Sequence, residues 1–343
     1  MTPRHYGNWF DIQIMGEDDM ASYKEFHKRS IEDRDGFWGE QAQLIHWNKQ
    51  PAQIYDFSNP PFVKWFVGGE TNLCYNAVDR HAETHPDRKA LVYISTETDE
   101  EKTYSFSELR AEVMRMAAIY QSLGVKKGDR VLIYMPMIAE ACFAMLACAR
   151  IGAIHSVVFG GFASHSLATR IDDAKPTVIV SADAGMRGGR PVPYKHLLDE
   201  AINLAEHKPA KVLMVNRGLD KAMEVVAGRD EDYATLRAQH LDAQVPVTWL
   251  ESSDPSYILY TSGTTGKPKG VQRDTGGYAV ALAASMKHIY CGNAGETFFS
   301  TSDIGWVVGH SYIIYGPLIA GMATVMYEGT PLRPDAGIWW KIC

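Results

Sequence analysis

Cysteine is scarce in this chain, and its distribution argues against metal and disulfide sites. Five cysteines are spread over 343 residues. Their number is odd, and no pair has the spacing of zinc ligands. Cys142 and Cys148 fall within an apolar helical pattern, so we expect them to be buried thiols. This cysteine usage fits a reduced, cytoplasmic protein.

An excess of positive charge is also missing. The chain has 34 Lys and Arg against 41 Asp and Glu, a formal net charge of −7. This balance gives no electrostatic support for nucleic-acid binding, so an anionic ligand must be held by a local positive site. With 46% hydrophobic and 22% charged residues, the composition is that of a soluble globular protein, and its length allows two or more domains.

One long segment, Val307 to Tyr327, has no formally charged residue and could span a bilayer by length. Glycines, a proline and His310 interrupt it. We therefore expect a buried helix, a turn and a core strand, and no membrane partner. His310 could act as a general base, but a lone histidine between apolar segments is more often a hydrogen-bonded core residue, which is our expectation here.

From residue 71 onward, strand and helix patterns alternate, which predicts an α/β fold. We expect stacked, mostly parallel sheets with helices on both faces. The predicted strands are Ala90–Ile94, Val131–Met135, Val157–Phe159, Thr177–Ser181, Val212–Val215, Tyr257–Tyr260, Thr297–Ser300 and Thr324–Tyr327. The predicted helices are Asn72–His85, Ser105–Leu123, Ala139–Ile151, Ser164–Ala174, His196–Glu206 and Tyr233–Leu241. Residues 20–70 should form short helices, with Pro60-Pro61 as an extended link.

The loop Tyr260–Lys269, with the sequence YTSGTTGKPK, is the most informative segment. Glycine frees backbone N–H groups to converge on an anion, hydroxyl groups donate further hydrogen bonds, and lysines supply positive charge. This composition suits the phosphates of a nucleotide, and the alternative is a polar surface turn. A Walker-type loop is excluded, because two residues separate Gly263 from Gly266 and Pro268 stands where Ser or Thr would hold Mg²⁺.

With Gly270, this loop resembles the phosphate loop of AMP-forming acyl-CoA synthetases. Three further motifs resemble the acetyl- and propionyl-CoA synthetase branch of that superfamily: WFVGG at 65–69, HSVVFGGF at 155–162 and SDIGW at 302–306. The resemblance extends over residues 20–343 and implies the large domain of the acyl-CoA synthetase and luciferase fold. A finer likeness to bacterial propionate–CoA ligases rests on Ser164–Ser166, Asp183–Gly185 and Val271–Asp274.

The resemblance implies a ligase that works in two half-reactions. A short-chain carboxylate, propionate or acetate, attacks the α-phosphorus of ATP, and coenzyme A then converts the acyl-adenylate to a thioester. ATP, Mg²⁺ and coenzyme A are the implied ligands, with no metal-binding residue assigned. Lys267 and Thr264 would act in catalysis. The implied phosphate-binding residues are Thr261, Ser262, Gly263, Thr264, Thr265, Gly266, Lys267 and Lys269.

The resemblance also implies sites for coenzyme A and for the acyl group. The coenzyme A residues would be Arg187, Gly188, Gly189, Arg190, Val308, Gly160 and Gly161. Without the resemblance, the arginines could equally be solvated and the Gly160-Gly161 pair a tight turn. Val308 replaces a threonine common in acetyl-CoA synthetases, which leaves its contact open. Trp306 and Val307 match acyl-pocket positions, where an indole would favour small acids; a core tryptophan is the alternative. We expect Trp339-Trp340 to be core.

The expected organisation has three segments: a disordered extension at 1–19, an acetyl-CoA synthetase-type N-terminal segment at 20–75, and the AMP-binding domain at 76–343. Family members are longer, so we expect this domain to be truncated and the small C-terminal domain to be absent. The chain would then belong to a ligase, inactive in isolation. The alternative is a non-catalytic remnant that only binds coenzyme A or nucleotide phosphates. The oligomeric state is not readable from the sequence.

Overall fold

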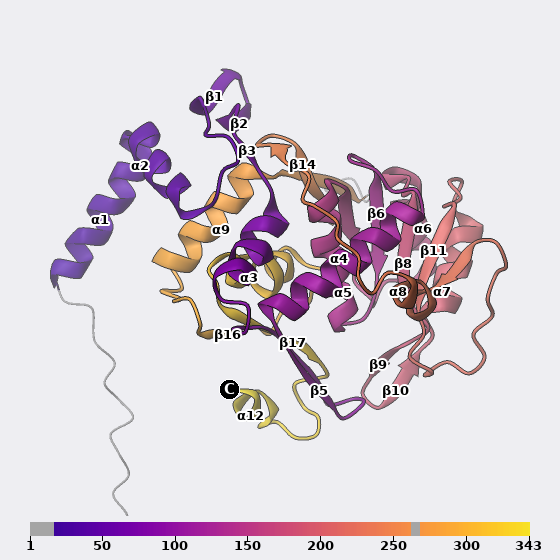
Figure 1. Cartoon of the computed structure of the whole chain (residues 1–343). Helices are drawn as coiled ribbons and strands as arrows, with labels where there is room; N and C mark the ends of the chain where they lie inside the picture. Colours follow the sequence, from indigo (N-terminus) through magenta and orange to yellow (C-terminus); the bar gives the residue numbers. More distant parts are fainter. Residues whose placement is uncertain (1–16, 262–267) are drawn as a thin grey trace, which may run out of the picture.

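The computed structural model describes residues 17–261 and 268–343, and it confirms the expected α/β class (Figure 1). Its main sheet has seven strands: β6 (Arg130–Tyr134), β7 (Ile154–Val157), β8 (Val178–Ala182), β11 (Lys211–Val215), β12 (Asp230–Asp232), β14 (Pro255–Thr261) and β15 (Lys269–Asp274). Their order is β12-β11-β8-β6-β7-β14-β15. Neighbouring strands are parallel except β14 and β15, which form an antiparallel edge.

A second sheet has four strands in the order β16-β17-β4-β5. They are β4 (Lys89–Ser95), β5 (Glu100–Ser105), β16 (Thr297–Phe299) and β17 (Ala323–Glu328). The remaining strands form three small pairs: β1 (Gln53–Asn59) with β2 (Phe62–Val67), β3 (Glu70–Thr71) with β13 (Leu250–Glu251), and β9 (Gly185–Arg187) with β10 (Arg190–Val192).

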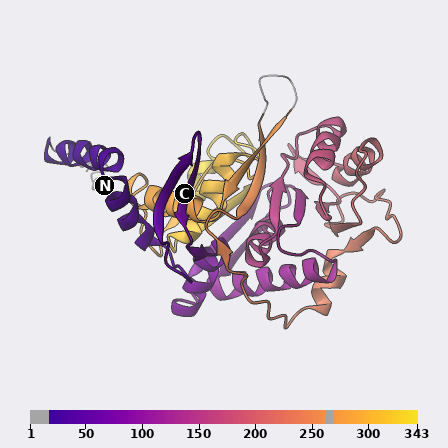
Figure 2. The same cartoon turned by 90° about the horizontal axis from the view of Figure 1, so that it is seen from above.

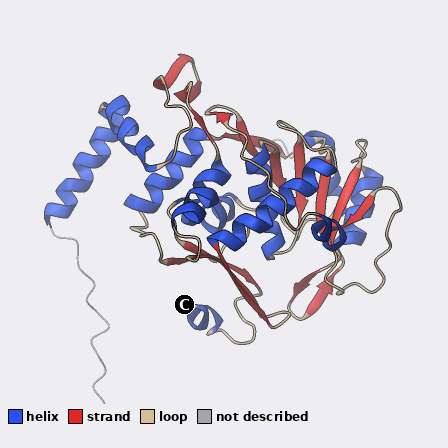
Figure 3. Ribbon diagram, in the orientation of Figure 1, coloured by secondary structure: helices blue, strands red, loops and turns tan. Residues whose placement is uncertain are grey.

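Helices lie on both faces of the main sheet (Figure 3). On one face lie α4 (Phe106–Ser122) and α5 (Ala139–Ile151), and on the other α6 (Ser164–Ala174) and α7 (Tyr194–Leu204). The other helices of the described residues are α1 (Glu17–Glu32), α2 (Arg34–Gln41), α3 (Arg80–Thr84), α8 (Tyr233–Gln239), α9 (Gly276–His288), α10 (Val307–Gly309), α11 (Gly316–Ile319) and α12 (Ile338–Ile342). Three short helical segments of other types are η1 (Ala42–Leu44), η2 (Tyr75–Asp79) and η3 (His310–Tyr315). Successive side chains of a strand point to opposite faces. In β6, Val131 and Ile133 therefore join one buried cluster with α4 and α5, whereas Leu132 and Tyr134 join another with α6 and α7.

The local sequence signals for two helices are confirmed. At the start of α4, Ser105 Oγ accepts a hydrogen bond from the Glu108 backbone N–H, and the Glu108 carboxylate accepts one from the Ser105 N–H. This reciprocal cap satisfies two backbone donors that a helix leaves free. In α5, Cys142 and Cys148 are buried thiols as expected, and burial raises the pKa of each well above its ordinary value.

Several expectations for the N-terminal segment are wrong. Helix α1 begins at Glu17, so it includes the last three residues of the segment 1–19 that was expected to lack structure. The segment 20–70 contains the β1–β2 hairpin as well as helices, and Pro60-Pro61 lies in its turn rather than in a link. The hairpin projects from the rest of the chain (Figure 1), and most of its residues are exposed or only half-buried. Its strands therefore lack the apolar alternation by which a strand is recognised.

Two further differences concern burial. Strand β7 covers 154–157 rather than 157–159, because His155 and Ser156 are polar yet fully buried. Trp340 is 82% exposed, so the expected core position is wrong; Ile338 is the buried residue of α12.

The segment 307–327 forms α10, η3, α11 and most of β17, as expected. In the described parts of the chain, none of the helices has both the length and the apolar character needed to cross a bilayer.

Candidate functional site

Three adjoining cavities surround the loop 159–163 and the segment 303–308. Their volumes are about 280, 320 and 710 Å³. Phe162 lines the first and third cavities, Trp306 lines the second and third, and Asp303 lines the first and second. The aromatic rings lie together: the centroid of Trp306 is 5.4 Å from that of Phe159 and 6.3 Å from that of Phe162. The two segments, far apart in the sequence, thus form one candidate site.

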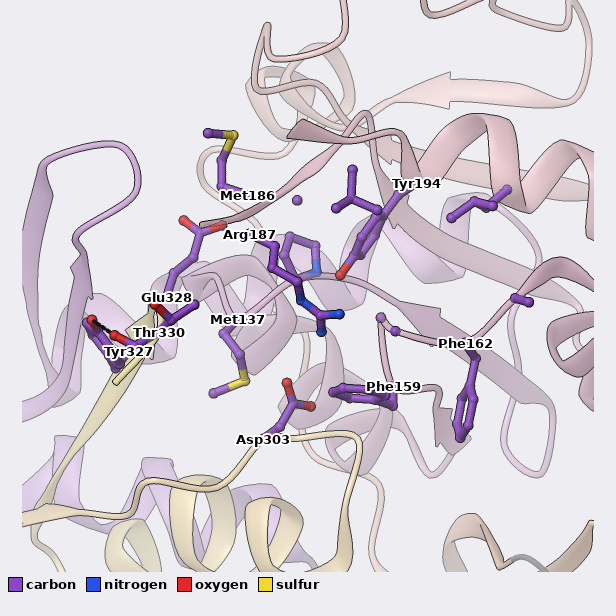
Figure 4. Close-up of a pocket in the computed structure, with 18 residues that line it drawn as sticks. Met137, Phe159, Phe162, Met186, Arg187, Tyr194, Asp303, Tyr327, Glu328 and Thr330 are labelled. Carbon is purple, nitrogen blue, oxygen red and sulfur yellow. Dashed lines mark hydrogen bonds between the residues drawn. The ribbon is translucent and has the colours of Figure 1, made fainter. Parts of the chain in front are cut away.

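The first cavity contains three of the residues predicted to bind coenzyme A, namely Gly160, Gly161 and Arg187. In Figure 4 the guanidinium group of Arg187 points into this cavity, between the Tyr194 hydroxyl and the Asp303 carboxylate. Its central carbon lies 5.8 Å from the ring centroid of Phe159. A guanidinium group offers paired donors to phosphate or carboxylate oxygens. The cavity can therefore accept an anionic group beside an aromatic wall.

Close packing requires glycine at position 160. A Cβ atom there would lie 1.8 Å from the Tyr194 hydroxyl oxygen. Tyr194 is held in place by stacking on Tyr134, with ring centroids 4.8 Å apart. The close approach of the Tyr194 side chain therefore accounts for this glycine, and its contact with coenzyme A stays a prediction.

The other predicted coenzyme A residues do not line the first cavity. Gly188 and Gly189 form the turn between β9 and β10, at φ values of 63° and 77° that favour glycine. Their backbone N–H groups both donate to the Glu97 carboxylate, at 2.9 and 2.6 Å. Arg190 is exposed on β10, and Val308 lies at the third cavity. An anion-binding turn is thus present, and an internal carboxylate occupies its donors.

The third cavity has mostly apolar walls. Trp306, Val307 and Val308 line it and are 47, 43 and 46% exposed. The alternative of a core tryptophan at 306 is therefore wrong. The remaining lining residues are Phe162, Arg170, Tyr257, Leu259, Tyr260, Thr261, Val271 and Arg273. This hollow can hold a small apolar group close to Thr261, where the predicted phosphate loop begins.

Most of the predicted phosphate loop lies outside the described residues: Ser262, Gly263, Thr264, Thr265, Gly266 and Lys267. Its two ends are described. Thr261 is the last residue of β14, Lys269 is the first of β15, and the two are paired in the antiparallel ladder. Figure 2 shows these strands in orange, running side by side. The loop therefore joins two paired strands, with Thr261 at the third cavity.

The strand end before the loop is tied to α6. The Tyr260 hydroxyl donates to Asp173 Oδ2 at 2.6 Å. The Arg170 guanidinium carbon lies 5.4 Å from the Tyr260 ring centroid and 4.4 Å from that of Phe162. These contacts join β14, α6 and the loop 159–163 into one support beneath the third cavity.

Burial controls the charge of two groups near the site. Burial raises the pKa of Asp303, although the Gly305 N–H donates to its Oδ1 at 2.7 Å and Arg187 favours the charged form. Burial lowers the pKa of His310 to about 4. His310 is fully buried, and its Nδ1 lies 3.0 Å from the Trp306 carbonyl oxygen. The expected core role is confirmed, because the residue is enclosed and hydrogen-bonded.

The cavities and motifs agree with a known family. A family model described as AMP-binding enzyme matches residues 78–343. The chain belongs to this family. A second model, described as acetyl-coenzyme A synthetase N-terminus, matches residues 23–77. The resemblance read from the loop and motifs is therefore confirmed for the AMP-binding enzymes.

Individual relatives of this AMP-binding chain are similar over most of its length. "Propionate--CoA ligase" of Salmonella typhimurium is 65% identical over 321 residues, covering 94% of this chain and 51% of the relative. "Acyl-CoA synthetase short-chain family member 3, mitochondrial" of Rattus norvegicus is 49% identical, covering 94% and 47%. The solved "Acetoacetyl-CoA Synthetase from Streptomyces lividans" is 29% identical with a TM-score of 0.85, covering 93% and 48%. The chain spans about half the length of the curated relatives it matches.

Sequence reasoning assigned no role to several residues at or beside the cavities, among them Glu97, Arg170, Tyr194 and Asp303. Asp303 lies inside the quoted SDIGW motif, so the motif itself could have indicated it. The other three lie far in sequence from the segments they contact. No periodicity or spacing links them to those segments.

Proposed function

We propose that this chain forms the substrate-facing part of an AMP-forming short-chain acyl-CoA synthetase. The observation that carries the proposal is the third cavity, whose apolar wall at Trp306 and Val307 adjoins Thr261, the start of the TSGTTGKPK motif. An acid with a short chain would place its apolar end against this wall and its carboxylate toward the nucleotide. Propionate is the favoured acid, since the names of two relatives specify it.

The proposed reaction requires two anions to meet. The carboxylate displaces pyrophosphate from the α-phosphorus of ATP, and the coenzyme A thiol then displaces AMP from the acyl carbon. Positive charge and backbone dipoles must offset the repulsion between carboxylate and triphosphate. Lys267 and Thr264 are the proposed catalytic residues of the loop, and Thr261, Ser262, Gly263, Thr265, Gly266 and Lys269 its proposed phosphate ligands.

Mg²⁺ would accompany ATP in this reaction. Within residues 17–261 and 268–343, no group of three or more His, Cys, Asp or Glu could hold a metal ion. Mg²⁺ in nucleotide sites commonly keeps several waters and is held largely by the phosphates. We assign none of the described residues to the ion. A cytoplasmic location, expected from the cysteine usage, stays a prediction.

The proposal can be tested with a fusion protein, in which this chain is followed by the part of the Salmonella typhimurium ligase that lies after the matched region. The measurement is the rate of thioester formation. This fusion should form propionyl-CoA, with ATP, propionate and coenzyme A all required. Replacing Lys267 with alanine in the fusion should lower the rate about a hundredfold, the effect of losing one charge-stabilising donor. The exposed Lys221→Ala change is the matched control and should leave the rate unchanged. A folded fusion that forms no thioester would contradict the proposal.

The β9–β10 turn gives a separate prediction for coenzyme A. If phosphates of coenzyme A use the Gly188 and Gly189 N–H groups, they compete with the Glu97 carboxylate. Replacing Glu97 with glutamine should then tighten coenzyme A binding about three- to tenfold, the scale of one net hydrogen bond. Calorimetric titration of the 343-residue chain measures this change. Asp99→Asn is the control, because it removes one negative charge nearby and should change coenzyme A binding little. If both variants tightened binding equally, the cause would be the loss of negative charge in general and not the freed N–H groups of the turn.

A further inference from the structure

Arg170 is a buried cation without a described anionic partner. The residue is 6% exposed, and its Nη1 donates to the Ser166 carbonyl oxygen at 2.6 Å. Within residues 17–261 and 268–343, no carboxylate forms an ion pair with it. Asp173, one turn further along α6, accepts from the Tyr260 hydroxyl. Burial lowers the pKa of Arg170, with Tyr260 opposing the effect. A guanidinium group has five N–H donors, so most of its capacity is unused by the described side chains.

The surroundings of Arg170 indicate what could use those donors. Arg170 lines the third cavity, which has a second arginine, Arg273, at its exposed side. The described lining contains no Asp or Glu. Apart from Thr261, the other lining residues are aromatic or aliphatic. A cavity with apolar walls and positive charge suits a small anion with an aliphatic chain.

The guanidinium group is also held in a fixed position. Its central carbon lies over the rings of Phe162 and Tyr260, at 4.4 and 5.4 Å from their centroids. Cation–π contacts of this kind orient the group without neutralising its charge. Tyr260 is itself fixed by Asp173. A positioned, uncompensated charge is typical of a binding residue, because a structural arginine of equal burial is normally paired.

We propose that Arg170 binds the carboxylate group of the short-chain acid substrate in the third cavity. This inference rests on the proposed function and names the residue that recognises the acid's charged end. Trp306 and Val307 would contact the aliphatic end of the same molecule. Arg170 would thereby hold the carboxylate near Thr261, the last residue of β14, and would favour the acid over its neutral analogues.

Fluorine NMR of the 343-residue chain with 3,3,3-trifluoropropionate tests this assignment. Replacing Arg170 with methionine, which keeps much of the side-chain stem but removes the charge, should weaken binding of the acid at least about tenfold. Arg170→Lys keeps the charge and should lose less. Arg273→Met is the matched control at the exposed side of the cavity and should lose less than threefold. The neutral amide, 3,3,3-trifluoropropionamide, should bind equally to wild type and to Arg170→Met, which also shows that the variant cavity is intact.

Three outcomes would overturn the assignment. Equal binding of the acid by wild type and Arg170→Met would overturn it while leaving the proposed function in place. Weaker binding of inorganic pyrophosphate by the variant, with acid binding unchanged, would assign the guanidinium group to phosphoryl oxygens instead. A wild-type chain that binds neither acid nor amide would contradict both this assignment and the proposed acyl site.

Discussion

Replacing Glu328 with alanine should lower the free energy of unfolding by about 3–5 kcal/mol, the cost of leaving a buried charge unpaired. Glu328, the last residue of β17, accepts two hydrogen bonds from the Arg217 guanidinium group, each 2.7 Å long. Only 4% of the Glu328 side chain and 11% of the Arg217 side chain are exposed. Urea unfolding of the 343-residue chain measures the change.

The effect should be large because this ion pair joins the two sheets. Arg217 follows β11 of the seven-stranded sheet, whereas β17 belongs to the four-stranded sheet. The hydroxyl groups of Tyr93 and Ser95, on β4, also donate to Glu328 Oε2, both at 2.9 Å. Removing the carboxylate therefore leaves a guanidinium group and two hydroxyl groups without their acceptor.

A surface ion pair provides the control for this prediction. Glu231 pairs with Lys211, and about a third of each side chain is exposed. Exposed pairs contribute about 0–1 kcal/mol, so Glu231→Ala should have a small effect. If Glu328→Ala were no more destabilising than Glu231→Ala, the pair would not hold the sheets together.

Acidification should destabilise the fold, because buried histidines resist protonation. His310 alone should lower the free energy of unfolding by about 3 kcal/mol between pH 6.5 and 4. Burial lowers the folded-state pKa of His310 to about 4, from an ordinary value of 6.5. As the pH falls below 6.5, the unfolded chain therefore takes up a proton that the folded chain excludes. Unfolding becomes more favourable until the pH reaches the folded-state pKa, where the loss levels off.

A second histidine adds to this pH dependence. His155 is fully buried, and burial, together with the neighbouring His310, lowers its pKa well below the ordinary value. The two rings are stacked with centroids 5.4 Å apart, so protonating both would place two charges in the core. His155 Nε2 lies 2.8 Å from the Tyr315 hydroxyl, which the neutral ring can satisfy.

Comparing wild type with His310→Asn tests this role of the buried histidines. In His310→Asn, the slope of unfolding free energy against pH between 6.5 and 4 should fall by about 1.4 kcal/mol per pH unit, the value for one proton. Slopes are compared because the substitution also changes packing. An unchanged slope would mean that folding does not lower the pKa of His310, which would contradict this account.

The sheet could be predicted wherever strands are buried on both faces. β6, β8 and β11 lie within one residue of their predicted positions, because their side chains are nearly all apolar. The prediction failed at β7, where His155 and Ser156 are buried polar residues, and at the exposed β1–β2 hairpin. Local hydrophobic patterning predicts where apolar side chains are buried. It does not predict buried polar pairs such as His155 and Tyr315, which bond to each other in the core.

The candidate site was predictable only where its residues lie within motifs. Gly160, Arg187 and Trp306 stand in quoted motifs or glycine-rich segments, and they surround adjoining cavities. Arg170 and Glu97 gain their importance from tertiary contacts: one with the rings of Phe162 and Tyr260, the other with a turn about ninety residues away. Such contacts become visible only when the chain is folded.

Transfer of oxygen-18 from propionate to AMP tests the central claim most directly. In the fusion to the remaining part of the Salmonella typhimurium ligase, a carboxylate labelled at both oxygens should attack the α-phosphorus through one of them. When the coenzyme A thiol breaks the bond to the acyl carbon, that oxygen should leave on AMP, and the thioester should keep the other. AMP carrying one labelled oxygen is the predicted result. Label in pyrophosphate or inorganic phosphate, or thioester formed with unlabelled AMP, would contradict formation of an acyl-adenylate at this site.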